Sequence, residues 1–179
     1  MRLSEKDTVE RFKARQGLIS KIQNLFTGGY ATKEDIREKD KQLRDLYYED
    51  LRELRHRWEK AYMDALDAGR SELGRPFKGA IQTLDRVIAQ IQRADYGYAG
   101  LMDRKGHIRE QELAGTFDFD REFEGELDRL RQSAEKVFAD VKSKLWVVVR
   151  DDMDAVNGDL QGVEGKWRER EKRFRSVEV

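Results

Sequence analysis

One stretch of the sequence decides the fold, residues 123–174, which read FEGELDRLRQSAEKVFADVKSKLWVVVRDDMDAVNGDLQGVEGKWREREKRF. Apolar residues recur in it at alternating steps of three and four, first from Phe123 to Val141 and again beyond Met153. Between these parts, three successive steps of four pass through Leu145. A repeat of 3.5 residues places one apolar stripe, here called a seam, against a partner helix, and an extra step of four locally unwinds the supercoil. The pattern therefore predicts a coiled-coil helix with a stutter.

The amino-acid composition favours long helices around a thin core. Charged residues make up 40% of the 179 residues and apolar residues 38%, and there is a single proline. Lysine and arginine together number 36, as do aspartate and glutamate. This balance argues against a strongly biased disordered tail. It also removes the domain-wide basic excess that is typical of nucleic-acid-binding proteins.

Simple features exclude several classes of site and predict a location. The lack of cysteine excludes disulfide scaffolds, thiol nucleophiles and zinc–thiolate sites. The longest apolar run, 145–149, is far shorter than a membrane span. The charged residues 1–13 lack the apolar stretch of a secretory signal. We therefore expect a cytoplasmic protein.

Apolar spacing, glycines and the proline predict an all-α fold in one domain covering residues 1–179. The first helix is expected to end at Gly28, where glycine can adopt the left-handed conformation that closes a helix. The second is expected to open with a capping-box variant at Thr32 and Asp35, and the third at Pro76. The expected helices are 4–27, 33–73, 76–95 and 119–175.

Two arrangements would bury the predicted seams. Glycines and tyrosines stop the helical rhythm after residue 95, so 96–118 is expected to form a short irregular or β-hairpin-like tip. In one arrangement, 33–73 and 76–95 form a long kinked arm that folds back against 119–175. In the other, four helices of unequal length form a compact up-down bundle. We favour the first, an elongated antiparallel bundle or coiled coil of three to four long helices, because matched seams on very long helices would otherwise stay exposed.

No cofactor or metal is predicted, although three acidic patterns were considered. Glu53 and His56 have the spacing with which di-iron bundles place a carboxylate and an imidazole on one helix face, but a second such pair is missing. The acidic run 118–128 begins like a calcium loop, yet Phe123 stands where that loop requires glycine. Acidic residues at the start of a helix are explained by its dipole. The aspartates within 151–154 fit a solvated helix face.

The segment 166–175 surrounds Trp167 and Phe174 with basic side chains. Such a pattern can lie on an anionic membrane or contact phosphates. The same charges also complement the dipole at a helix C-terminus, and the two aromatic residues continue the seam. The candidate anion-binding residues are Lys166, Arg168, Arg170, Lys172, Arg173 and Arg175.

The favoured function is that of a non-enzymatic interaction protein: an adaptor, scaffold or regulatory subunit that binds partner helices or itself through its seams. Affinity would come from apolar stripes, and flanking charges would set partner choice. The expected partner is therefore another protein or a second copy, and no small-molecule substrate is inferred. The candidate partner-interface residues are Trp58, Tyr96, Tyr98, Trp146, Leu160, Val163, Trp167 and Phe174.

Two alternatives belong to other functional classes. The first is a peripheral binder of anionic membranes or nucleic acid that uses 166–175. The second is a helical-bundle enzyme with a carboxylate metal site assembled across helices, which sequence patterns alone do not reveal.

Overall fold

The computed structural model describes residues 5–28, 32–94 and 110–175, and all regular structure in these ranges is helical. This confirms the all-α prediction. In chain order the elements are α1 (Glu5–Gly28), α2 (Lys33–Asp67), the 3₁₀ turn η1 (Ser71–Leu73), α3 (Gly74–Arg93), α5 (Glu110–Lys142) and α6 (Trp146–Arg175).

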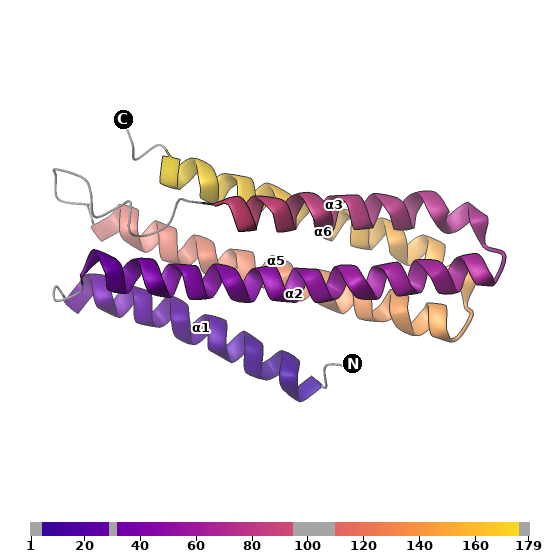
Figure 1. Ribbon diagram of the computed structural model, residues 1–179, viewed down its shortest axis with the longest axis horizontal. Helices are drawn as coiled ribbons and strands as arrows, with labels where there is room; N and C mark the ends of the chain where they lie inside the picture. Colours follow the sequence, from indigo (N-terminus) through magenta and orange to yellow (C-terminus); the bar gives the residue numbers. More distant parts are fainter. Residues whose placement is uncertain (1–4, 29–31, 95–109, 176–179) are drawn as a thin grey trace.

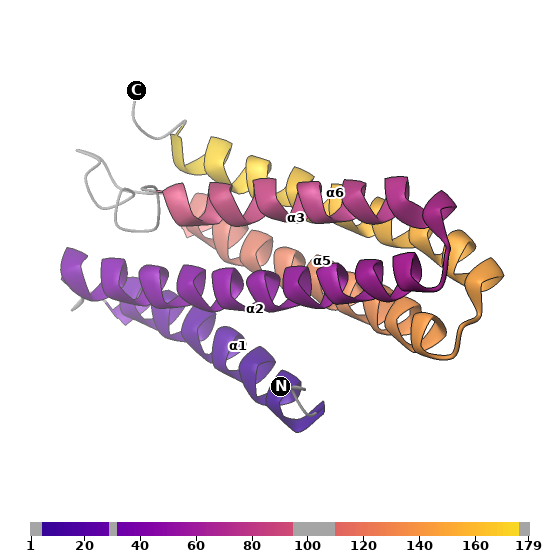
Figure 2. The same cartoon turned by 45° about the vertical axis from the view of Figure 1, so that its right-hand side comes forward.

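Four of these helices surround a common core (Figures 1 and 2). The neighbours around the core are α2 and α3, α3 and α6, α6 and α5, and α5 and α2. We call this group the four-helix ring. In chain order the four helices alternate in direction along the long axis, so around the ring α2 and α3 are antiparallel, as are α5 and α6, whereas α3 and α6 run parallel and so do α2 and α5 (Figure 1). The first helix, α1, lies outside the ring and packs mainly against α2 and α5.

The predicted seams supply the core of the ring. Along α3, for example, the buried positions recur at steps of three and four, as the heptad pattern requires. At one end of the core Trp58 packs with its ring edge toward Phe77 and Phe138, with ring centroids 5.5 and 4.9 Å apart. The buried apolar residues of α6 are Val149, Met153, Val156, Leu160, Val163 and Trp167.

The helix expected over 119–175 is in fact two helices, so that expectation was wrong. The chain leaves α5 after Lys142 and re-enters a helix at Trp146. Leu145 N donates to Asp140 O at 2.9 Å, Lys144 N donates to Val141 O at 3.0 Å, and Lys144 has a φ of 60°. This is a Schellman ending with a non-glycine residue in the left-handed position. The stutter thus marks a reversal of the chain, which lets the two halves of one seam face each other.

The elongated arm that we favoured is also wrong, because α2 and α3 pack side by side and antiparallel. The second helix ends at Asp67, earlier than expected, with the same hydrogen bonds as α5: Arg70 N to Ala65 O and Gly69 N to Leu66 O. Here Gly69 holds the left-handed position, with a φ of 75°. Two similar reversals at one end of the molecule therefore replace two long rods with two helical hairpins.

The boundaries of the predicted tip differ from the structure at one end. Residues 110–118 belong to α5, whereas they were expected to be irregular. The rest of the expected irregular or β-hairpin-like tip, 96–109, lies outside the described residues. The third helix begins at Gly74, close to the expected start at Pro76.

The two reversals make a matched test of backbone strain. A side chain in the left-handed conformation costs about 1–2 kcal/mol, whereas glycine adopts it freely. We expect Gly69→Ala to lower the free energy of unfolding by about 1 kcal/mol and Lys144→Gly to raise it by up to about 1 kcal/mol. A Cβ at Gly69 would meet no atom within 4 Å, so steric clash does not contribute. Urea unfolding followed by circular dichroism measures both free energies of unfolding. A Gly69→Ala variant with the same free energy of unfolding as the wild type would contradict this explanation.

Candidate functional site

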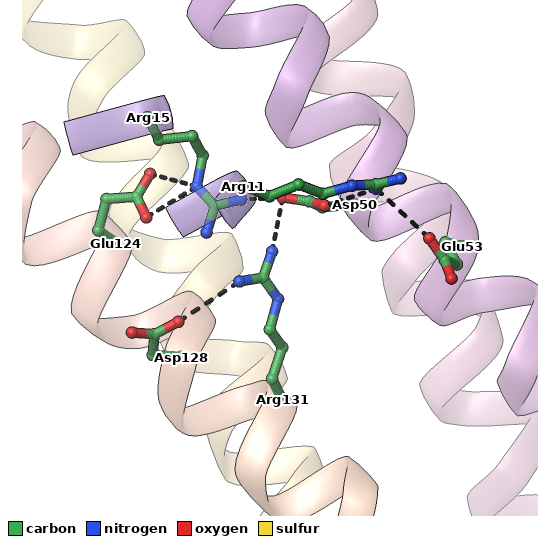
Figure 3. A network of polar contacts seen from close by, with 7 residues as sticks. All are labelled: Arg11, Arg15, Asp50, Glu53, Glu124, Asp128 and Arg131. Atoms are coloured by element: carbon green, nitrogen blue, oxygen red, sulfur yellow. Dashed lines mark hydrogen bonds and ion pairs between the residues drawn. The ribbon is translucent and has the colours of Figure 1, made fainter. Parts of the chain in front are cut away.

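A network of charged side chains joins α1 to the four-helix ring (Figure 3). Arg15 of α1 is fully buried, and its Nε donates to the two carboxylate oxygens of Glu124 at 2.7 and 2.8 Å. Its Nη1 donates to Asp50 on α2. Asp50 also accepts from Arg11 of α1 at 2.9 Å and from Arg131 of α5. Three helices therefore meet around one carboxylate.

Burial and charge pairing act in opposite directions on the pKa values of Arg15 and Glu124. Burial alone would lower the pKa of Arg15, but the charges of Glu124 and Asp50 outweigh it and raise that pKa. Burial raises the pKa of Glu124, although Arg15 and Arg131 act in the opposite direction. The carboxylate of Glu124 therefore depends on the guanidinium of Arg15 to remain ionised inside the protein.

A second buried arginine repeats this arrangement within the ring. Arg170 of α6 donates from Nη2 to Asp40 at 2.8 Å and from Nε to Asp120 at 2.9 Å, and all three side chains are buried. Its guanidinium lies 5.1 Å from the ring centroid of Trp167. Asp40 also accepts from Arg44 Nε at 3.0 Å. This half of the core is thus built from ion pairs as well as apolar contacts.

An aromatic cluster around Tyr47 lies near both buried arginines. The ring centroid of Tyr47 lies 5.0 Å from Phe123 and 6.4 Å from Trp167, with edge-on geometry. Burial raises the pKa of Tyr47 well above its ordinary value, and the charges of Glu124 and Asp120 raise it further. The phenol is therefore neutral at any physiological pH.

Carboxylates from α2 and α5 do converge in the core, as an enzyme with a cross-helix metal site would need. A guanidinium lies between each pair of them: Asp50 and Glu124 share Arg15, while Asp40 and Asp120 share Arg170. Within the described ranges no three His, Asp or Glu side chains gather to form a group suited to a metal ion.

The Glu53–His56 pair is not brought together at an interior site. Glu53 accepts a hydrogen bond from Arg11 at 3.3 Å. The side chain of His56 is 82% exposed and lies 3.9 Å from Glu59. Both residues thus take part in surface contacts of α2.

The structure places four of the eight candidate partner-interface residues inside the chain's own core. Trp58, Leu160, Val163 and Trp167 are buried among the ring helices. Trp146 is half-buried, and the guanidinium of Arg70 lies 5.9 Å from its ring centroid. Tyr96, Tyr98 and the side chain of Phe174 lie outside the described part of the chain.

The candidate anion-binding residues have separate surroundings. Lys166 Nζ lies 2.8 Å from Glu122 and 3.6 Å from Glu169, and Arg168 donates to Glu164 at 2.7 Å. Arg170 is the buried arginine of the ring, and Lys172 is exposed. The side chains of Arg173 and Arg175 are not described. The six cations are therefore not one free basic strip.

Sequence reasoning missed the role of Arg170, although the signal was present. Arg170 stands at a seam position between Trp167 and Phe174, and Asp40 interrupts the seam of α2. Opposite charges at seam positions of two helices indicate a buried pair that fixes helix register.

One end of the bundle exposes large apolar side chains, a feature that the sequence analysis did not identify. Among the described residues, the exposed large apolar side chains come from the end of α2 and from the turn between α5 and α6, both at the right-hand end in Figure 1. Val147 is 82% exposed. We call this set the end patch; its members are Met63, Leu66, Leu145, Val147 and Val148. An open depression of about 750 Å³ adjoins it, lined in part by Tyr62, Leu66 and Pro76.

Comparisons with known proteins give no relative: no family model matches, and neither a curated protein nor a solved structure is similar. In the described ranges, no helix carries an apolar stretch long enough to cross a membrane.

The buried pair around Arg170 gives a prediction about stability. Arg170→Gln leaves Asp120 buried without its guanidinium, and removing one partner of a buried pair costs about 3–5 kcal/mol. Arg168→Gln is the control, because Arg168 is mostly exposed and its pair with Glu164 is worth less than about 1 kcal/mol. Urea unfolding at neutral pH compares the two. Equal and small losses of unfolding free energy in the two variants would show that the buried charges contribute little to stability.

Proposed function

We propose that this protein is a non-enzymatic interaction protein, an adaptor, scaffold or regulatory subunit, that associates with itself through the end patch. The observation that carries the proposal is the clustering of exposed large apolar side chains at one end, while the seams are covered within the chain. Exposed apolar clusters are typical of protein–protein contact sites.

The proposal differs from the sequence-based expectation in where the partner binds. Seam residues such as Leu160 and Val163 are buried by neighbouring helices of the same chain. We propose that the seams form an intramolecular coiled coil, since their 3.5-residue repeat pairs α5 with α6 and α2 with α3. The surface left for association is therefore the end of the bundle.

Charge around the end patch supports a second copy as the partner. The end of α2 carries the exposed Asp64 and Asp67, whereas the turn between α5 and α6 is flanked by the exposed Lys142, Lys144 and Arg150. In a two-fold symmetric contact, the acidic half of one copy faces the basic half of the other. The patch is thus complementary to itself in charge as well as apolar.

The non-enzymatic part of the proposal rests on how the polar core is arranged. The carboxylates that converge there are each held by arginine, an arrangement that fixes helix positions and leaves no open coordination site between them. The buried ionisable groups thus have a structural explanation.

The test is the mass in solution of the full chain, measured by size exclusion with in-line light scattering. We expect a dimer, and Val147→Asp to weaken association by tenfold or more, because it places a charge in the centre of the contact. The control is Gln161→Asp, which adds the same charge at an exposed site farther along α6. High salt should weaken the wild-type dimer only partly, since apolar contacts persist. A monomer at all concentrations would contradict self-association, and so would equal effects of the two variants.

A further inference from the structure

The open depression beside the end patch lies where α2 turns through η1 into α3, at the right-hand end in Figure 1. Its volume is about 750 Å³, and its lining comes from α2, η1, the first half of α3 and α6. Sites for small molecules usually measure about 300–1,000 Å³. The depression shares Leu66 with the end patch and none of its other residues, so a ligand held here would be additional to self-association.

The lining of the depression is positively charged. It contains Arg75 and Lys78 and no acidic residue, although acidic and basic residues are equally numerous in the chain. The two cations are three residues apart on α3, so their side chains leave the same face of the helix. Both are exposed, and neither forms an ion pair with another described residue. The depression therefore presents two cations to an anion.

An aromatic side chain forms part of the wall. Tyr62 of α2 is half-buried, and its ring stacks on the buried Phe77, with centroids 6.0 Å apart and an interplanar angle of 27°. The Nζ of Lys78 lies 5.9 Å from the ring centroid of Tyr62. A positive charge thus lies next to an aromatic ring whose position is fixed by packing. This combination suits a ligand that joins an anionic group to a planar ring, because planar rings stack on aromatic side chains.

Two amide side chains also line the depression. Asn157 on α6 is half-buried, and its side chain makes no hydrogen bond with another described residue. Gln82 on α3 is exposed. An amide group both donates and accepts hydrogen bonds, as the polar edge of a heterocyclic ring requires. The cations, the aromatic ring and the amides thus correspond to the phosphate and the base of a nucleotide.

Gly79 leaves room for such a ligand. It lies within α3 and lines the depression, and a Cβ at this position would meet no atom within 4 Å. Glycine in a helix interior is less favourable than any other residue except proline. A leucine at position 79 would therefore favour the helix while it fills part of the depression. Gly165 on α6 also has open space at its Cβ position, but it does not line the depression.

We propose that this depression binds a small anion that carries a planar ring, of the class of nucleoside monophosphates. Arg75 and Lys78 contact the phosphate, since a guanidinium can donate two parallel hydrogen bonds to phosphate oxygens and an ammonium adds a point charge. Tyr62 contacts the ring. The amides of Gln82 and Asn157 bind its polar edge.

Isothermal titration calorimetry of the full chain with AMP, adenosine and inorganic phosphate tests the proposal. Adenosine and phosphate are expected to bind about tenfold more weakly than AMP, because each makes only part of the contacts. Gly79→Leu should lower the affinity for AMP by about tenfold without loss of stability. The control is Gly165→Leu, which makes the same change outside the depression and should leave the affinity unchanged.

A second pair of variants tests the charges. Arg75→Gln combined with Lys78→Gln should lower the affinity for AMP by about tenfold and leave that for adenosine unchanged. Arg37→Gln combined with Lys41→Gln is the control. It removes the same charge at exposed positions near the start of α2, whereas Tyr62 stands near the end of that helix.

Several results would overturn the proposal. They are an absence of AMP binding at millimolar concentration, equal AMP affinity in the two leucine variants, and binding of phosphate as tight as that of AMP. Tighter binding of a single-stranded oligonucleotide than of AMP would also overturn it, because the occupant would then be a nucleic acid. None of these results bears on association through the end patch, which is measured by mass.

Discussion

A buried carboxylate must be paired, and this constraint places the helices of one half of the molecule. Arg170 on α6 can reach Asp40 on α2 and Asp120 on α5 only when α6 holds a single register relative to both helices. Arg15 imposes the same condition on α1. A shift of register would leave a buried charge without its partner, which costs several kcal/mol. The buried charges therefore exclude such a shift more strongly than apolar contacts do, because apolar contacts tolerate small shifts. The two arginines thus make one arrangement of the helices much more stable than its neighbours.

The other half of the core is organised by packing. Trp58, Phe77 and Phe138 fill it with edge-on aromatic contacts, and Arg57 lies 4.4 Å from the ring centroid of Phe138. Beyond them the chain reverses twice, and the apolar residues of these reversals have no further helix to cover them. The end patch is therefore a consequence of two hairpins ending at the same place. The end patch is the surface through which we propose that the protein associates with itself.

The sequence predicted the helical content and which faces are buried, because a 3.5-residue repeat is a local property. Along α3, the apolar residues that recur at steps of three and four from Phe77 to Ile91 are all buried. The pattern did not predict the reversal at Lys144, since a lysine in a left-handed conformation has no sequence signature and the apolar rhythm continues through it. The sequence pattern also could not predict which charges lie close together across helices, because the distance between Arg15 and Glu124 depends on where the chain reverses. Arg170 was assigned to a basic surface because its neighbours are basic, yet its seam position was the more informative property.

The central claim is that α2, α3, α5 and α6 enclose the core and that α1 packs on them from outside, through the ion pairs of Arg15 as well as through Ile19 and Ile22. Hydrogen–deuterium exchange followed by mass spectrometry at neutral pH tests this directly, because it reports the free energy of opening for each segment. The account predicts that backbone amides of residues 10–24 exchange at least tenfold faster than those in the buried middle of α2 and α5. Equal protection of α1 and the ring helices, lost together in one cooperative event, would contradict it.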